Sequence, residues 1–340
     1  MLSRVAESLF WMGRYMERAD GTARILDVHL QLMLEAPAAD EGAACQSLLA
    51  IMGVSHPDRG LRAADVANLL AVDPLEPSSI AYSLRAAREN GRRAREIIST
   101  ELWECLNTLN QNMPSEVPED RHHALFAWVR ERSAMAAGIG YTTMIRDEPY
   151  QFFMLGQGLE RADMTARLLA TRELTDTAGA SWTTILRSCG GYEACLRSRR
   201  GLPTKEDAAE FLLLDTFFPR SIQFAFNRAL TALGELEPNG AGARPGGEAG
   251  PGATGGPGGP GGPGRRRQSQ RLTRGVRHGD PAWILGQAIS QLRYQPIDEI
   301  LADLPDQMDR VQQATSAASE AVRQRYFPVL AAPAWVGEEA

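Results

Sequence analysis

The chain has 340 residues, of which 44% are hydrophobic, and its net charge is −6 at pH 7. This length suits two domains or one large bundle, at about 100–200 residues per domain. Outside the six arginines between positions 265 and 277, the chain has 30 basic residues against 42 acidic ones. An acidic body argues against a general nucleic-acid-binding surface, so we expect no specific nucleic-acid partner.

The expected cellular location follows from the N-terminal segment, the length of the apolar runs and the cysteines. The first 20 residues contain acids and lack the long apolar stretch of a signal peptide. No run approaches the roughly 20 apolar residues that span a bilayer. The four cysteines form no C-x-x-C pair, and the histidines lack zinc spacing. We therefore expect a soluble, cytoplasmic protein with free cysteines, no membrane contact and no metal site built from cysteine and histidine.

Apolar residues recur at three- and four-residue spacing along most of the chain, whereas strand signals are scarce. This pattern predicts an all-α fold. The expected helices lie near 3–34, 42–53, 62–72, 77–110, 119–138, 148–174, 181–197, 205–214, 219–236, 281–293 and 297–326. Pro149 and Pro219 stand where the first turns of two of these helices should begin.

Residues 238–264 contain 13 glycines and 6 prolines. Such a segment buries no core and is predicted to be disordered. An arginine-rich run follows it, and we interpret 238–280 as an insert at an exposed position. The alternative is an arm that binds nucleic acid or an acidic partner.

One predicted helical segment occurs twice in the sequence. Residues 10–26 and 153–169 are identical at ten of 17 positions, with a shift of 143. Residues 65–80 and 207–222 are identical at seven of 16 positions, with a shift of 142. Because the two shifts agree within one residue, the repeating unit is about 140 residues long.

The repeat predicts a helical bundle of two tandem copies of one module, packed about a pseudo-twofold axis. The predicted units are 1–145 for the first copy, 146–237 with 281–330 for the second, and 238–280 for the insert.

A helical wheel divides the repeated helix into two faces at 100° per residue. The predicted packing stripe consists of Met12, Met16, Ala19, Ala23 and Leu26. Glu17, Asp20 and Arg24 lie on one flank, and Asp20 with Arg24 forms a favourable i,i+4 pair. Arg18 points to the other side. The second copy repeats these charges with Glu160, Arg161, Asp163 and Arg167.

Three interpretations of these retained charges stay open. They are exposed charges that stabilise the helix slightly, a buried ion-pair network that joins the two copies, or a polar site. In a polar site the glutamates act as acid and base or as metal ligands, and the arginines bind carboxylate or phosphate. The catalytic candidates are Glu17 and Glu160. The binding candidates are Asp20, Arg24, Asp163, Arg167, Arg18, Arg161, Arg88, Arg92 and Arg220.

The last three binding candidates lie outside the repeated helix. Arg88 and Arg92 share one face of a predicted helix, which is either solvated or an anion-binding wall. Arg220 precedes Ser221 at a predicted helix start, where backbone N–H groups attract anions; the plainer interpretation of this serine is helix capping. The chain has no P-loop, dinucleotide fingerprint or nucleophile elbow, so the sequence names no cofactor.

Four segments together resemble the bacterial alpha-E family, an all-helical domain of unknown function. They are MLSRVAESLFWMGRYMERADGTARILDV, ARENGRRAREIISTELWECLN, FFMLGQGLERADMTARLL and FLLLDTFFPRSI. The resemblance covers nearly the whole chain except the insert and its basic run. It implies genes that lie beside a circularly permuted ATP-grasp ligase and a transglutaminase-like protease, and a role in forming or trimming peptide-like amide bonds.

Two functional hypotheses follow. The first is a binding or accessory component that holds a peptide-like substrate or the ATP-grasp enzyme itself. The alternative is a helical enzyme acting on peptide or amide bonds with Glu17 and Glu160 as an acid/base pair, which requires at least one carboxyl group with a raised pKa. A purely structural duplication is the third possibility.

Overall fold

The computed structural model describes residues 3–35, 40–55, 60–173, 181–237 and 277–327, and within these ranges the chain forms helices and loops without a strand. The helices are α1 (Ser3–Glu35), α2 (Glu41–Met52), α3 (Ala63–Val72), α4 (Ile80–Arg93), α5 (Thr100–Gln111), α6 (His122–Thr143), α7 (Glu148–Ala170), α8 (Trp182–Ser188), α9 (Tyr192–Arg199), α10 (Lys205–Leu214), α11 (Ile222–Leu236), α12 (Pro281–Tyr294), α13 (Ile297–Ala302) and α14 (Leu304–Tyr326). Short 3₁₀ turns lie at Glu119–Arg121 and Thr171–Glu173. The predicted all-α class is confirmed.

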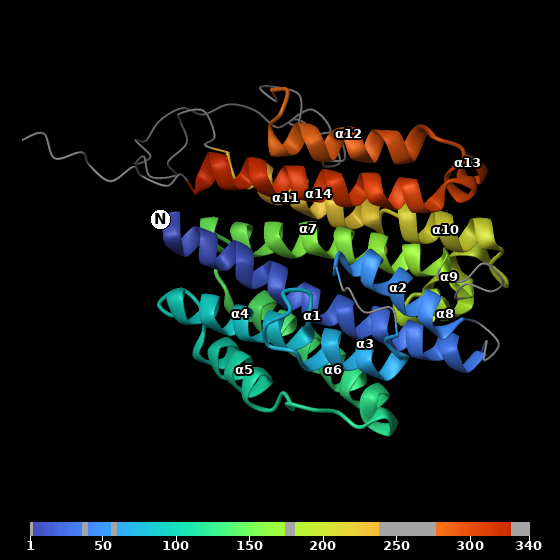
Figure 1. Cartoon of the computed structure of the whole chain (residues 1–340). Coiled ribbons are helices and arrows are strands. Elements are labelled where there is room, and N and C mark those ends of the chain that lie inside the picture. Colours follow the sequence, from blue (N-terminus) through green and yellow to red (C-terminus); the bar gives the residue numbers. More distant parts are fainter. Residues whose placement is uncertain (1–2, 36–39, 56–59, 174–180, 238–276, 328–340) are drawn as a thin grey trace, which may run out of the picture.

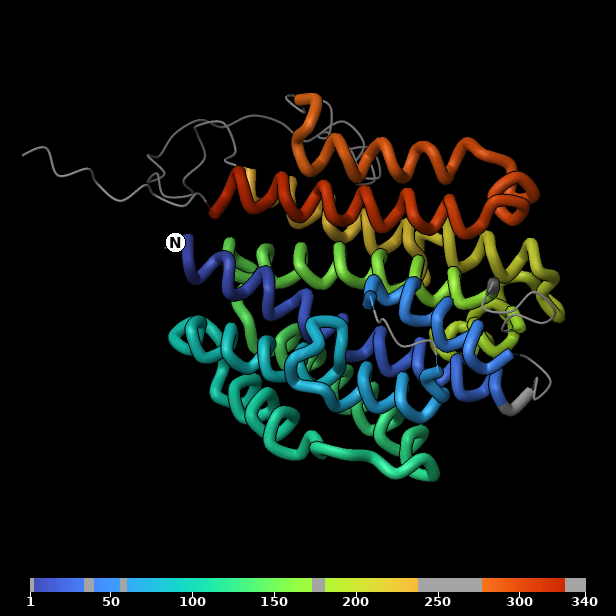
Figure 2. The backbone as a smooth tube through the Cα atoms, in the orientation of Figure 1, coloured from blue at the N-terminus to red at the C-terminus, as the bar shows by residue number. Residues whose placement is uncertain are grey.

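Two long helices, α1 and α7, pack against each other at the centre of the bundle (Figure 1). On one side α1 contacts α4 and α6, and α5 covers that pair. On the other side α7 contacts α11 and α14, and α12 covers those. The backbone trace in Figure 2 shows this order of layers, with α5 and α12 at opposite edges.

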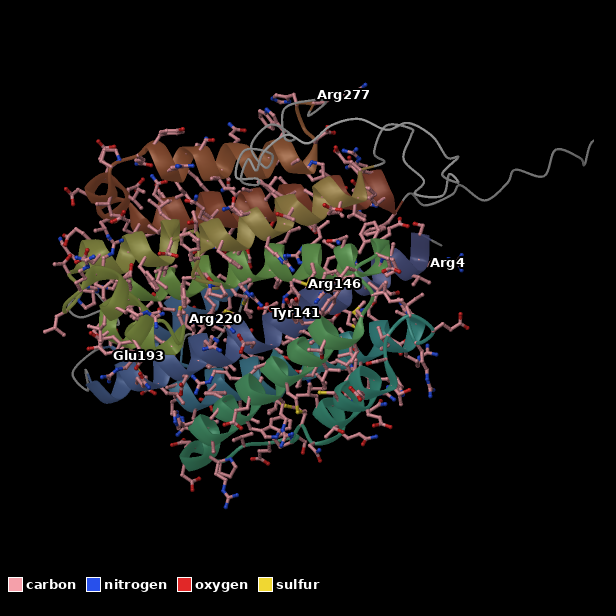
Figure 3. All side chains as sticks on the ribbon, turned by 180° about the vertical axis from the view of Figure 1, so that it is seen from behind. Arg4, Tyr141, Arg146, Glu193, Arg220 and Arg277 are labelled. Carbon is pink, nitrogen blue, oxygen red and sulfur yellow. The ribbon has the colours of Figure 1, made fainter. Side chains whose placement is uncertain are left out.

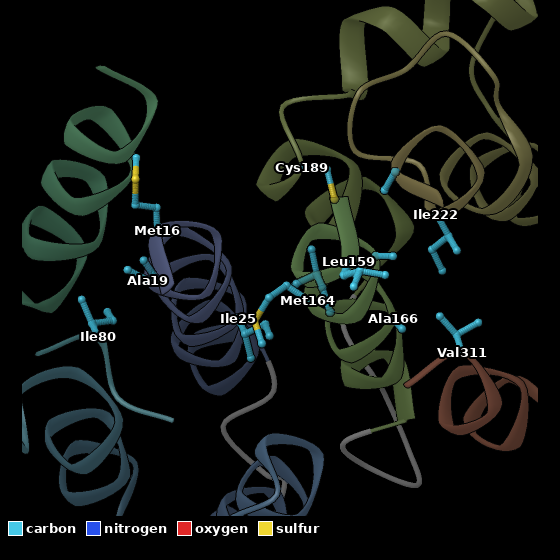
Figure 4. Packing of buried hydrophobic residues seen from close by; sticks show 14 of the residues in the cluster. Met16, Ala19, Ile25, Ile80, Leu159, Met164, Ala166, Cys189, Ile222 and Val311 are labelled. Carbon is cyan, nitrogen blue, oxygen red and sulfur yellow. The ribbon is translucent and has the colours of Figure 1, made fainter. Parts of the chain in front are cut away.

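The central position of α1 explains why its burial extends beyond the predicted stripe. All five stripe residues, from Met12 to Leu26, are buried, as predicted. Leu9, Phe10 and Ile25 are buried as well because neighbouring helices cover α1 on more than one side. In the close view Ile25 and Met164 lie between α1 and α7, whereas Ala19 lies on the opposite side of α1 (Figure 4).

Glycine lets the two central helices approach closely. A Cβ atom added at Gly13 would meet the backbone carbonyl oxygen of Phe153, and one added at Gly156 would meet that of Phe10. Both positions therefore exclude any side chain. These paired contacts bring the backbones of α1 and α7 together near the start of the repeated segment.

Serine caps begin the two helices that flank the centre. Ser79 accepts from the backbone N–H of Tyr82 at the start of α4, and Ser221 accepts from that of Phe224 at the start of α11. The expected start of α11 at Pro219 is thus wrong, because the serine cap places the first helical residue at Ile222. Pro149 lies in the first turn of α7, as predicted.

The helix predicted over 77–110 is two helices. α4 ends at Arg93, and α5 begins after Ser99, whose hydroxyl accepts from the backbone N–H of Leu102. Apolar periodicity continues across the break because Ile98 and Leu102 are both buried in the same core. Periodicity therefore found the buried face and missed the turn.

Two further predicted helices are also interrupted. The helix expected over 181–197 breaks between α8 and α9, where Gly190 has a φ of +64° that disfavours other residues. The helix expected over 297–326 breaks at Asp303, and Pro305 lies in the first turn of α14. A proline in that position fits a helix start because its missing N–H would have no helical partner there.

The predicted insert at 238–280 lies outside the described residues, apart from positions 277–280. There the backbone N–H of Arg277 donates to the Asp280 carboxylate directly before α12. Among the described helices, none combines the length and the apolar character that crossing a bilayer requires.

The close contact at Gly156 gives a testable prediction. We expect Gly156→Ala to lower the free energy of unfolding by about 1–3 kcal/mol, because the added methyl group meets backbone rather than a movable side chain. Chemical denaturation measures this. Gly234→Ala, at an exposed position of α11, is the control, since nothing lies within 4 Å of its added Cβ. It should be neutral or stabilising by up to about 1 kcal/mol. Equal effects of the two variants would contradict close packing.

Candidate functional site

The two Glu–Arg dipeptides of the repeat pair with each other across the α1/α7 contact. Arg161 donates through Nε to Glu17 Oε2 at 3.0 Å and through Nη2 to Glu17 Oε1. Arg18 donates through Nε to Glu160 Oε1 at 2.5 Å and through Nη2 to Oε2 at 3.3 Å. Adjacent helical residues point about 100° apart, so a glutamate cannot pair with the arginine that follows it. Instead, the glutamate of each dipeptide accepts two hydrogen bonds from the arginine of the other dipeptide, in the fork-shaped geometry typical of arginine and carboxylate.

Glu160 lies at the most enclosed point of this network, and its side chain is 0% exposed. Arg14 Nε donates to Glu160 Oε2 at 2.5 Å, and Arg14 Nη1 donates to the hydroxyl of Ser319 on α14 at 2.7 Å. Burial alone would raise the pKa of Glu160, but attraction to Arg14 and Arg18 outweighs it and lowers that pKa to about 2. Glu160 is therefore ionised at neutral pH.

The predicted i,i+4 pairs are present on both central helices. Arg24 Nε lies 2.9 Å from Asp20 Oδ2, and Arg167 Nε lies 2.8 Å from Asp163 Oδ2. Each arginine also donates through Nη1 to a backbone carbonyl in the last turn of a neighbouring helix, Ser188 on α8 for Arg24 and Ile51 on α2 for Arg167. Cations are favourable at that end of a helix. These pairs thus connect the central helices to α8 and α2.

Arg220 joins the network from the loop before α11. Its Nη1 lies 2.9 Å from Asp20 Oδ2. Burial raises the pKa of Asp20, but the attraction of Arg220 and Arg24 outweighs it and lowers that pKa to about 2. The network thus has one half around Glu17 and Asp20 and another around Glu160 and Asp163. In the second half, Asp163 accepts from the hydroxyl of Thr315 on α14 at 3.1 Å.

Arg88 and Arg92 are not brought to this network. Arg88 Nε donates to Asn107 Oδ1 at 2.6 Å, and its guanidinium lies 5.4 Å from the ring centroid of Trp103. Arg92 pairs with Glu89 on the exposed face of α4. Their partners therefore lie on α4 and α5, and the geometry favours the solvated face over an anion-binding wall.

A cleft of about 260 Å³ opens beside Glu17. Its polar walls are formed by Glu17, Asp20, Ser133, Gln157, Arg161 and Arg220. Arg220 lies toward the middle of the face seen in Figure 3, whereas Arg4 and Arg277 lie near its edges. The cleft thus gives access from the surface to one half of the network.

Sequence reasoning missed three residues of this site. Arg14 was set aside because it aligns with Gln157 in the repeat and so is not retained. Its position four residues before Arg18 was the available signal, since i and i+4 share a helix face. Gln157 and Ser133 are almost fully buried beside the cleft, and within the described structure Gln157 Nε2 and Ser133 Oγ have no hydrogen-bond partner.

The geometry does not support the predicted acid/base pair. Glu160 has no proton to donate at neutral pH, because its pKa is about 2, and two arginines occupy both its oxygens. Neither the raised pKa nor the open carboxyl group that general acid catalysis needs is found at Glu160. Within the described residues, no group of three or more His, Cys, Asp or Glu side chains is arranged to hold a metal ion.

Removing the charge of Glu160 tests the network directly. We expect Glu160→Gln to lower the free energy of unfolding by about 3–5 kcal/mol, because it leaves two nearly buried arginines without their counter-charge. Calorimetry or chemical denaturation measures this. Glu320→Gln is the matched control, since Glu320 pairs with Arg323 on the exposed face of α14 and should contribute little. A loss no larger than that of the control would show that the network does not stabilise the fold.

Comparisons with known proteins identify the family. A family described as "a predicted alpha-helical domain with a conserved ER motif" matches residues 1–250, a range that contains both Glu–Arg dipeptides. An uncharacterized protein of Mycobacterium bovis and two of Mycobacterium tuberculosis are 26% identical over 271 residues, which cover 71% of this chain. The match spans 31% of the length of each relative, and no solved structure matches. The chain therefore belongs to the Alpha-E family.

Proposed function

We propose that the protein is a binding or accessory component of a peptide-modification system, acting with an ATP-grasp ligase and a transglutaminase-like protease. The cleft beside Glu17 would hold a peptide-like substrate. The observation that carries this proposal is the cleft itself, which opens onto charged side chains already held in place by ion pairs. Such support from neighbouring side chains suits a binding site because the binding groups lose little freedom when a ligand arrives.

The proposed architecture is two tandem modules, 1–145 and 146–237 with 281–330, related by a pseudo-twofold axis. Reciprocal contacts support it: Glu17 pairs with Arg161 as Glu160 pairs with Arg18. A twofold relation produces this pattern, because a contact from one copy to the other is then made in both directions.

The loops that precede α4 and α11 support the same relation. Thr22 donates to the carbonyl of Ser78, and Thr165 donates to that of Arg220. In the repeat, Thr22 aligns with Thr165 at the shift of 143, and Ser78 aligns with Arg220 at the shift of 142. The aligned threonines, Thr22 on α1 and Thr165 on α7, thus donate to aligned backbone carbonyls within their own modules.

The comparison with relatives favours an accessory role. In the mycobacterial proteins the matched region is about a third of a longer chain, so there it accompanies other protein segments. We propose that this chain acts next to a separate catalytic partner. The four cysteines are buried and free, which suits the reducing cytoplasm where we place the protein.

Co-purification tests this proposal. The tagged chain is mixed with the neighbouring ATP-grasp protein that the family resemblance implies, and complex formation is followed by size-exclusion chromatography. We expect a stable complex and faster peptide-dependent ATP hydrolysis. Arg220→Ser should reduce the stimulation because it changes a wall of the cleft, whereas Arg323→Ser on the exposed face of α14 should not. Absence of both a complex and any stimulation would contradict the accessory role.

A further inference from the structure

We infer that the cleft beside Glu17 is a carboxylate-binding subsite that recognises the carboxylate of a peptide through Arg161, Arg220 and Gln157. This inference rests on the proposed binding function of the same cleft and specifies its ligand. It goes beyond the ion pairs, which by themselves hold α1, α7 and their neighbours together.

The charge accessible in the cleft is positive. The side chains of Glu17 and Asp20 are 6% and 5% exposed, whereas those of Arg161 and Arg220 are each 22% exposed. With Arg24, three guanidinium groups accompany two carboxylates in this half of the network. An incoming group therefore meets guanidinium before carboxylate, and an anion is attracted.

Both arginines retain donors for a ligand. A guanidinium has five N–H donors. Arg161 uses Nε and Nη2 on Glu17, and Arg220 contacts Asp20 through Nη1. Within the described residues no hydrogen bond occupies Arg161 Nη1 or Arg220 Nη2. Two such groups on one cleft match the two oxygens of a carboxylate.

The unpartnered polar atoms of the cleft walls also favour an acceptor ligand. Gln157 and Ser133 are 5% and 6% exposed, yet Gln157 Nε2 and Ser133 Oγ lack a partner in the described structure. A buried donor without an acceptor is unfavourable, so most such groups in proteins are paired. A carboxylate in the cleft would supply the acceptor after a rotation of these side chains.

In the half of the network around Glu160, an arginine occupies the position that aligns with Gln157. Arg14, which aligns with Gln157, extends to Glu160 and to Ser319. Gln157 is shorter than arginine and leaves space beside Glu17. Arg220, which aligns with Ser78, supplies the third cation instead. Both halves thus hold three arginines for two carboxylates, and in the half around Glu17 two of these arginines, Arg161 and Arg220, line a cleft.

The alternative to a carboxylate ligand is a cationic one, such as a lysine side chain, which would pair with Glu17 as Arg14 pairs with Glu160. The partly exposed guanidinium groups of Arg161 and Arg220 oppose it. The volume of about 260 Å³ is also smaller than the roughly 300–1,000 Å³ of typical small-molecule pockets. It suits one residue of a peptide rather than a nucleotide.

Calorimetric titration of the full chain at low salt tests the inference. The probes are a trialanine peptide with a free C-terminus, the same peptide amidated, amidated Ala-Ala-Glu, amidated Ala-Ala-Lys, and inorganic phosphate. We expect the free acid to bind at least about tenfold more tightly than its amide, because charge-assisted hydrogen bonds to the carboxylate are lost. Binding of amidated Ala-Ala-Glu as tight as that of the free acid would assign the carboxylate to a side chain. Equal binding of acid and amide, preference for lysine, binding of phosphate alone, or no binding would each overturn the inference.

Two variants locate the binding in the cleft. Arg220→Ser introduces the residue found at the aligned position 78 and should weaken binding of the free acid at least about tenfold, whereas Arg323→Ser should leave it unchanged. Gln157→Arg keeps every ion pair and should fill the cleft as Arg14 fills its counterpart, which abolishes binding while thermal stability is retained. Unchanged binding in folded Gln157→Arg would overturn the assignment.

The inference and the proposed function fail separately. A chain that forms the ATP-grasp complex but shows no preference for the free acid contradicts the carboxylate subsite alone. A chain that prefers the free acid but neither binds nor stimulates the ATP-grasp protein contradicts the accessory role alone.

Discussion

The structure depends on charges buried between two helices that touch through glycine. At Gly13 and Gly156 the backbones of α1 and α7 leave no room for a side chain, and a few residues further each helix carries Glu and Arg in succession. A charge removed from water must be paired or it destabilises the fold strongly. Adjacent helical residues diverge, and Glu17 and Glu160 each pair with arginine on the opposite helix. The paired helices then position every layer packed around them.

Asymmetry within this network creates the candidate site. One half is closed by Arg14, which reaches Glu160 and Ser319. The other half has Gln157 at the aligned position, and its third arginine enters from the loop before α11. The charges therefore join the two helices on both sides, and those beside Glu17 also line a cleft. Under the proposed function, the structural and binding roles that the sequence left as alternatives are combined in one network.

Much of this arrangement could be predicted from the sequence, and the remainder depends on information that periodicity lacks. Spacing identified the all-α class, the buried stripe of α1 and the Asp20–Arg24 pair, since these depend on residues a few positions apart. A helical wheel gives the direction of Arg18 but not its partner on α7. The break after Arg93 was missed because buried residues continue across it, and Arg14 was missed because the repeat comparison kept only identical positions.

The coupling energy between Glu17 and Arg161 tests the central claim most directly. A double-mutant cycle with Glu17→Gln and Arg161→Gln, measured by chemical denaturation, separates their interaction from the separate effects of each substitution. The pairing across α1 and α7 predicts a stabilising coupling of about 1–3 kcal/mol, in the range found for residues in direct contact. Two substitutions whose effects add within about 0.5 kcal/mol would contradict the account.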